Sequence, residues 1–253
     1  MVTIDLNCDM GESFGVYTLG CDAEAMPYVT SVNVACGFHA SDPSTMLNTV
    51  RLAQKYGVAI GAHPSFPDLV GFGRRVMAAS KEEIFADVVY QIGALWGMCK
   101  SEGAKLQHVK VHGALYNVAE KDLEIGKTIA EAIKAVDPDL YMVCLGKSAM
   151  VEAAKAVGVR YVEEAFADRA YTSQGNLVSR KQAGAVIHDL DIIANRVLTM
   201  VKDKQVTSID GAVVPISAQT ICVHGDTPGA VAMIKTIKSQ LEQNGITLKS
   251  FGS

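Results

Sequence analysis

The sequence predicts an α/β fold: a single-domain (β/α) barrel, seven-stranded and distorted relative to a TIM barrel. Seven short runs are rich in Val and Ile, helical patterns separate most of them, and no linker rich in Pro, Gly or Ser divides the 253 residues. Apolar runs that alternate with helices are typical of parallel strands buried on both faces. Seven or eight βα units in roughly 250 residues favour a closed barrel over an open doubly wound sheet. We therefore expect one domain over residues 1–253.

The elements follow in order along the chain. The β-branched runs predict strands at Thr3–Cys8, Ser31–Cys36, Val58–Ala62, His108–His112, Leu140–Leu145, Val159–Glu163 and Thr220–His224. Apolar residues at helical spacing predict helices at Thr45–Tyr56, Lys81–Lys100, Leu123–Val136, Ser148–Val157, Asp189–Val201 and Val231–Gln243. Capping residues mark helix starts, such as Asp42 before Pro43 and Ser80 three residues before Glu83. Asp210-Gly211 between two β-branched runs, Val206–Ile209 and Ala212–Ile216, predicts a β-hairpin.

The charge balance excludes some classes of partner. The chain has 23 Lys and Arg against 27 Asp and Glu, a net charge of −4, and the basic residues are spread out. Nucleic acid is therefore not an expected partner. The sequence shows neither a basic leader nor an apolar stretch near the roughly 20 residues of a membrane span, so we expect a cytoplasmic protein without a membrane partner. An apolar fraction of 49% is compatible with a homodimer.

Polar side chains collect where the predicted strands end. Because the carboxyl ends of parallel strands meet at one mouth, residues far apart in sequence are expected to surround one cavity. These residues are Asn7, Asp9, Glu12, His39, Asp42, His63, Asp68, Lys110, His112, Asn117, Glu163, Glu164, Asp168, Arg169, His224 and Asp226. Four of the six histidines occupy this position, while His108 and His188 do not. The repetition favours a functional cluster over four unrelated structural histidines.

Arginines supply candidate anion-binding groups. Arg74 and Arg75 end the glycine-containing loop that starts at Gly71, and Arg169 and Arg180 flank a second loop, Ala170–Ser179. Guanidinium groups suit bidentate binding of a carboxylate or phosphate. The sequence contains no GxxxxGK[ST], GxGxxG, GxSxG or HExxH motif, which argues against P-loop NTPases, Rossmann dehydrogenases, serine esterases and zincins. Asp and His at strand ends leave a bound metal open.

Six separate motifs carry a resemblance to a known family. They are Asp5–Glu12, Asn33–Asp42, Gly61–Ser65, His112–Asn117, Phe166–Tyr171 and Cys222–Asp226. In this order they resemble the LamB/YcsF family, from about residue 3 to residue 245. Two positions depart from the expected pattern, Ser41 in place of Gly and Val111 in place of Pro. Both changes are conservative and leave the resemblance standing.

The resemblance implies a barrel related to polysaccharide deacetylases and the activity of the A subunit of bacterial 5-oxoprolinase. That activity is the ATP-dependent opening of 5-oxo-L-proline to L-glutamate, together with B and C subunits and with Mg²⁺ as the counter-ion of ATP. Because no nucleotide motif is present, either an unrecognised site binds ATP or a partner subunit performs the phosphorylation. Candidate catalytic residues are Asp9, His39, His63, His112, His224 and Asp226. Candidates for binding the substrate or phosphate are Asn7, Glu12, Asn33, Arg74, Arg75, Lys110, Asn117, Asp168, Arg169 and Arg180.

Two other readings remain open. A metal-dependent deacetylase or amidohydrolase acting on its own would use Asp9, His39 and His63 as ligands in place of a phosphorylation step. A non-catalytic subunit would bind substrate and dock other chains, although four histidines are more than an anion pocket requires. The sequence assigns no protein-bound metal and does not say which histidine is the general base.

Overall fold

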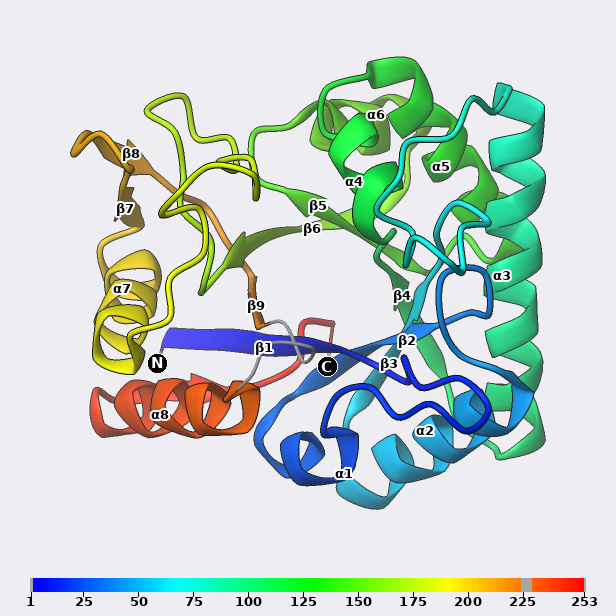
Figure 1. The fold of residues 1–253 in the computed structure, drawn as a ribbon, viewed down its shortest axis with the longest axis horizontal. Helices are drawn as coiled ribbons and strands as arrows, with labels where there is room; N and C mark the ends of the chain where they lie inside the picture. The colour runs from blue at the N-terminus through cyan, green and yellow to red at the C-terminus, as the bar shows by residue number, and fades with distance from the viewer. Residues whose placement is uncertain (1, 224–228, 253) are drawn as a thin grey trace.

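A closed ring of parallel strands forms the centre of the computed structural model, which describes residues 2–223 and 229–252. The ring runs in the order β1-β2-β3-β4-β5-β6-β9 and closes by pairing β9 with β1 (Figure 1). Its strands are β1 Val2–Met10, β2 Ser31–Ala35, β3 Ala59–His63, β4 Leu106–Val109, β5 Tyr141–Leu145, β6 Arg160–Phe166 and β9 Thr220–Val223. The predicted seven-stranded (β/α) barrel is confirmed.

β1 closes the ring by pairing with β2 on one side and with β9 on the other. Asn7 lies opposite Ser31 of β2 and opposite Cys222 of β9. The amino-terminal half of β1 also pairs with β10, Ile246–Leu248. β6 pairs directly with β9, so the two strands between them in sequence lie outside the ring. The ring is irregular between β3 and β4, where the strand register shifts at Ile60 and Gly61.

Helices surround the ring (Figure 1). The six predicted helices are present as α2 Pro43–Tyr56, α3 Lys81–Ser101, α5 Leu123–Val136, α6 Ala149–Val157, α7 Leu190–Lys202 and α8 Ala230–Gln243. Their starts follow the expected chemistry: Asp42 accepts from the Ser44 and Thr45 amides, and Ser80 forms a capping box with Glu83. Three short helices were not predicted, α1 Asp22–Ala25, η1 Met26–Tyr28 and α4 Gly113–Ala119. Such short segments give too few turns for a helical period to be recognised.

The predicted hairpin is also present. β7 Gln205–Thr207 and β8 Val213–Pro215 form an antiparallel two-stranded sheet outside the barrel (Figure 1). In residues 2–223 and 229–252 no helix is both long and apolar enough to cross a membrane.

The interior of the barrel is polar. Along β1, the side chains of Asp5, Asn7 and Asp9 alternate with apolar ones, and all three are buried. Successive side chains of a strand point to opposite faces, so the polar set lies on the inner face and residues such as Leu6 pack against the helices. The strands are buried on both faces as expected, but one face of β1 carries hydrogen-bonding groups that need partners inside the ring.

Candidate active site

The deepest layer of the interior is built on Asp5. Its carboxylate accepts hydrogen bonds from Thr30 Oγ1 (2.6 Å), Ser31 Oγ (2.7 Å) and Thr220 Oγ1. Burial raises the pKa of Asp5 to about 6, although the three hydroxyl donors act in the opposite direction. The layer ties β1 to β2 and β9 and supports the residues above it.

The next layer orients the carboxylate of Asp9. Asn33 Nδ2 donates to Asn7 Oδ1 and to Asp9 Oδ1, both at 2.8 Å. Asn33 Oδ1 lies 2.8 Å from His108 Nε2, and burial, followed by the positive charge of Lys110, lowers the pKa of His108 to about 3. A neutral His108 that donates from Nε2 fixes which way the Asn33 amide points. Asp9 is therefore held in one orientation from below.

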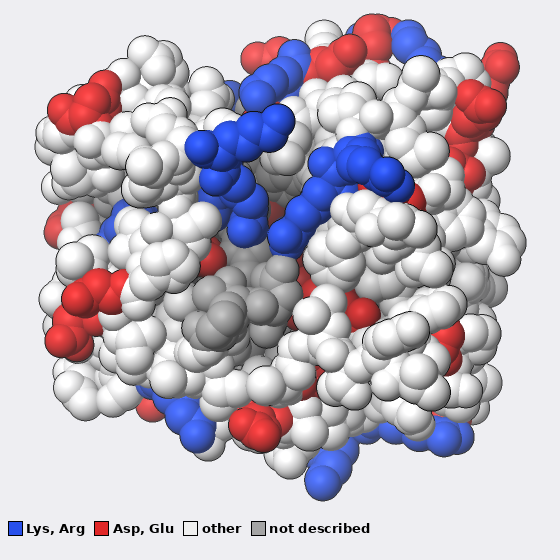
Figure 2. Space-filling view, in the orientation of Figure 1, with Lys and Arg blue, Asp and Glu red and all other residues white. Residues whose placement is uncertain are grey.

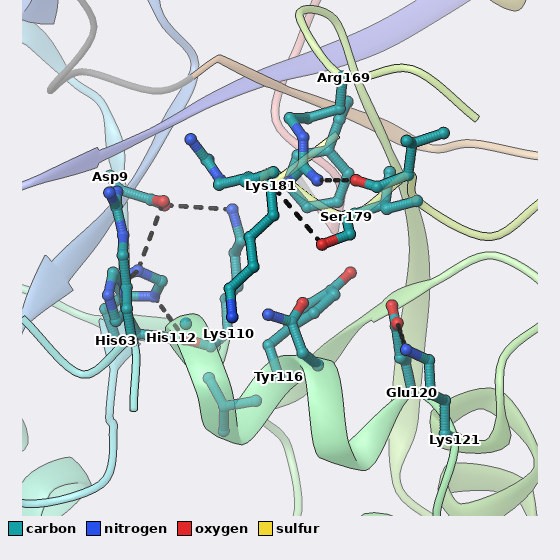
Figure 3. Close-up of a pocket in the computed structure, with 18 residues that line it drawn as sticks. Asp9, His63, Lys110, His112, Tyr116, Glu120, Lys121, Arg169, Ser179 and Lys181 are labelled. Carbon is teal, nitrogen blue, oxygen red and sulfur yellow. Dashed lines mark hydrogen bonds and ion pairs between the residues drawn. The ribbon is translucent and has the colours of Figure 1, made fainter. Parts of the chain in front are cut away.

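Lys110 is a buried cation at the centre of the site. It is only 3% exposed, and its Nζ lies 3.1 Å from Asp9 Oδ1, 3.2 Å from Glu164 Oε2 and 2.9 Å from Cys222 Sγ. Burial by itself would lower the pKa of Lys110, but the negative groups around it, Asp9 foremost, raise that pKa well above its ordinary value. Lys110 thus remains charged, placed between Asp9 and Tyr116 (Figure 3).

Two histidines beside Asp9 have their protons fixed by backbone carbonyls. The Lys110 carbonyl accepts from His63 Nδ1 at 2.6 Å, and the Phe72 carbonyl accepts from His112 Nε2 at 2.9 Å. The other two ring nitrogens, His63 Nε2 and His112 Nδ1, face each other at 2.9 Å. Asp9 Oδ2 lies 3.4 Å from His63 Nε2. Burial, followed by the neighbouring His63, lowers the pKa of His112 well below its usual range, so its ring is neutral at pH 7.

His39 and Glu12 complete this group from the far side. The His39 ring stacks on His112 with centroids 3.9 Å apart, and His39 Nε2 lies 3.6 Å from Glu12 Oε1. His39 is 1% exposed, and neither of its ring nitrogens has a hydrogen-bond partner among the described residues. Burial, then the neighbouring His112 and His63, lower the pKa of His39 well below its ordinary value.

The loop that precedes Arg74 packs closely against His39 and His112. Gly73 has a positive φ of 62°, and a Cβ there would come within 2.8 Å of His112 Cδ2 and 2.9 Å of His39 Cβ. The Gly73 carbonyl also accepts the Ala114 amide at the start of α4. Glycine is therefore required at this position, both for the conformation and for the close approach to the two histidines.

A cavity of about 380 Å³ opens above the site. Asp9, His63, Lys110 and His112 line its floor, and cationic side chains surround its entrance (Figures 2 and 3). The cationic lining residues other than Lys110 are Arg74, Lys121, Arg169, Arg180 and Lys181. Arg169 is buried, and its Nη2 donates to the Val178 carbonyl at 2.6 Å, which holds part of the loop Ala170–Ser179 against the opening. The cavity thus combines proton-transfer groups with a positive entrance suited to an anion.

The structure brings together many of the predicted residues at different depths. Asp9, His63, Arg74, Lys110, His112, Asn117, Arg169 and Arg180 line the cavity. Asn7 and Asn33 lie beneath Asp9 and outside the lining, so they position its carboxylate and do not face a substrate. Glu12 and His39 likewise stand behind the two cavity histidines.

Other predicted residues are not brought to the cavity. Arg75 turns outward: its side chain is 65% exposed, and its guanidinium donates to the carboxylate of Asp68. Asp168 is buried outside the lining, where its carbonyl accepts the Ile187 amide. His224 and Asp226 lie outside the described residues.

Several residues of the site are not among the candidates for catalysis or binding. Glu164 and Cys222 contact the Lys110 ammonium, His108 orients Asn33, and Tyr116 lines the cavity. The signal for His108 is its spacing of two from Lys110, because residues i and i+2 of a strand share a face. The polar alternation Asp5, Asn7, Asp9 is the same signal in β1. Tyr116 follows His112 by four residues and so lies on the same face of α4.

Comparisons with known proteins agree with this fold. The LamB/YcsF family model matches residues 4–253. A protein of Acinetobacter baumannii (strain ACICU), named as the A subunit of 5-oxoprolinase, is 53% identical over 248 residues, which cover 98% of each chain. The crystal structure of a lactam utilization protein from Thermus thermophilus has a TM-score of 0.95 at 48% identity, covering 98% of this chain and all of that one.

A more distant structure shares the fold alone. A family 4 carbohydrate esterase from Streptomyces lividans has a TM-score of 0.52 at 11% identity, covering 99% of this chain and 93% of the esterase. The barrel fold is thus shared with that esterase. With a family model that spans nearly every residue and a full-length relative more than half identical, the chain belongs to the LamB/YcsF family.

Proposed function

We propose that this chain is the A subunit of a 5-oxoprolinase, which opens the lactam ring of 5-oxo-L-proline to give L-glutamate, coupled to hydrolysis of ATP to ADP and phosphate. The names of the Acinetobacter and Thermus proteins support this activity. The observation that carries it is the cavity itself, in which Asp9, His63 and His112 stand beside a buried ammonium. An unstrained lactam is a poor electrophile, so its hydrolysis requires both proton transfer and charge stabilisation.

The geometry suggests a division of roles at the floor of the cavity. Lys110 remains protonated and therefore serves as a fixed positive charge for the lactam oxygen or a phosphate, and not as a base. Asp9 and His63, 3.4 Å apart, are placed to activate water. We assign to neutral His112, which lines the same floor, the proton exchange with the ring nitrogen as the carbon–nitrogen bond breaks; its Nδ1 must first part from His63 Nε2.

ATP enters the proposal through the chemistry of the lactam oxygen. Phosphorylation of that oxygen by ATP releases ADP and makes the ring carbon electrophilic. One water adds to this carbon and the carbon–nitrogen bond breaks, with a proton delivered to the nitrogen, to give a glutamyl acyl phosphate. A second water then hydrolyses the acyl phosphate to glutamate and phosphate. The sequence has no P-loop motif, so we assign the phosphorylation, with ATP and its Mg²⁺, to an assembly with B and C subunits. Arg74, Arg169 and Arg180 at the cavity entrance would bind the substrate carboxylate or the phosphate.

The test is glutamate formation from 5-oxoproline and ATP, with this chain alone and then with the B and C subunits. We expect turnover in the mixture and none with the chain alone, and we expect His63→Ala to abolish turnover while the circular dichroism spectrum is unchanged. Glutamate formation by the chain alone without ATP would instead indicate a stand-alone amidohydrolase. Near-normal activity of mixtures that contain His63→Ala or His112→Ala would indicate a subunit that only binds substrate.

A further inference from the structure

We propose that Glu12, His39, His63 and His112 bind one divalent transition-metal ion of the zinc class behind the floor of the cavity. One donor atom from each of these four buried residues lies within 4.8 Å of the other three. The ligands of a tetrahedral zinc ion are about 3.4 Å apart, as follows from bonds of about 2.0–2.1 Å. Side-chain movements, including rotation of one ring, are therefore enough to bring the four donors around an ion.

The two fixed tautomers supply the first argument. Because the Lys110 and Phe72 carbonyls accept from His63 Nδ1 and His112 Nε2, the remaining nitrogens, which face each other at 2.9 Å, are the ones that these two rings can offer to a metal ion. A backbone carbonyl that holds the second ring nitrogen is also the usual support of a histidine that ligates a metal.

His39 supplies the second argument. A buried imidazole with no hydrogen-bond partner for either nitrogen among residues 2–223 and 229–252 is costly, and a metal–nitrogen bond would compensate for that loss. Its ring stacks on His112, so one of the two rings must turn before both can point at the same ion. Of the two rings, His39 would lose less by turning, since it has no hydrogen bond to break among these residues.

The donor set selects the class of ion. Three imidazoles and one carboxylate are nitrogen and oxygen ligands that suit zinc and its neighbours and are too nitrogen-rich for Mg²⁺ or Ca²⁺. The carboxylate of Glu12, 3.6 Å from His39 Nε2 and 4.0 Å from His112 Nδ1, supplies a negative charge to the site. A bound ion would polarise a carbonyl or phosphoryl oxygen at the cavity wall formed by His63 and His112. The site stands whether or not the substrate is 5-oxoproline. While an ion is bound, His63 and His112 would be ligands and not proton carriers, and Asp9 would be left to activate water.

The test measures metal binding directly. The full chain is stripped with a chelator, dialysed, and titrated with Zn²⁺ by isothermal calorimetry and with Co²⁺ by visible absorption. We expect one ion per chain and Co²⁺ bands typical of tetrahedral nitrogen and oxygen ligation. His39→Ala and Glu12→Gln should each weaken binding at least about 100-fold, more than is usual for a residue that only supports a ligand.

The matched control is His188→Ala, which removes an exposed histidine outside the group and should bind as the wild type does. His39→Ala breaks no hydrogen bond among the described residues, and its circular dichroism and melting temperature in chelator check that it is folded. The proposal is overturned if the wild type shows no saturable binding, or if His39→Ala and Glu12→Gln bind as tightly as His188→Ala.

Discussion

Replacing Lys110 with methionine tests how the polar interior of the barrel is stabilised. Methionine fills a similar volume, but it removes the ammonium that lies 3.1 Å from Asp9 and 3.2 Å from Glu164. Both carboxylates are buried, Asp9 at 8% and Glu164 at 1% exposure, so water cannot replace the lost charge. Removing one partner of a buried ion pair costs about 3–5 kcal/mol, because an uncompensated charge remains. We expect the free energy of unfolding of Lys110→Met to fall by that amount at pH 8.

Urea unfolding, followed by circular dichroism, measures this loss at pH 8. The double variant Lys110→Met/Glu164→Gln should recover about 0.5–3 kcal/mol relative to Lys110→Met, as expected for residues in direct contact. Lys81→Met, which breaks an exposed pair with Glu124, is the control and should leave stability almost unchanged.

Two results would refute this reasoning. A loss below about 1 kcal/mol for Lys110→Met would mean that the ammonium does not compensate the two carboxylates. A double variant no more stable than Lys110→Met would mean that Glu164 is not coupled to the lysine.

Three further outcomes are expected. The pKa of Asp5 is raised from 3.8 to about 6, so its contribution to stability is complete well below pH 3.8 and is lost as the pH rises through 6. The stability of Asp5→Asn relative to the wild type should therefore rise by about 2–3 kcal/mol between pH 4 and pH 7.5 in urea unfolding, and a constant difference would contradict the shift. His112→Ala should lower kcat in the reconstituted assay by about 10²–10⁴-fold with a native circular dichroism spectrum, whereas a change in KM alone would argue against proton transfer. Arg74→Ala should raise the KM of the anionic substrate by about 10-fold or more, because Arg74 lines the cavity. Arg75→Ala should leave the KM unchanged, because the Arg75 guanidinium pairs with Asp68. Equal effects of the two substitutions would contradict the different placement of the two arginines.

The order of elements was predictable because it rests on local physics. β-branched apolar runs favour strands, apolar residues at helical spacing favour helices, and side chains such as Asp42 and Ser80 satisfy free amides at helix starts. Asp210-Gly211 predicted the turn between β7 and β8 for the same kind of reason. None of these signals depends on a distant part of the chain.

The position of the site was predictable from topology. Parallel strands place their carboxyl ends at one mouth, and this rule alone brought Asp9, His63, Lys110 and His112 to one cavity. The depth of each site residue in the barrel and its interaction partners were not predictable, because both depend on the register between strands. Asp5 and Thr220, 215 residues apart, meet only when β1 pairs with β9 and closes the ring.

The sequence by itself determined the (β/α) barrel, the order of its elements and the ring of polar residues at its mouth. Only the tertiary structure decided that Arg75 turns away to Asp68, that Glu164 reaches Lys110, and that carbonyls of other segments orient the histidines. The physical reason is the distance along the chain over which each kind of interaction acts. Sterics and hydrogen bonding within a few residues set secondary structure, whereas the partner of a buried charge or imidazole is whatever group the closed barrel brings within about 3 Å of it.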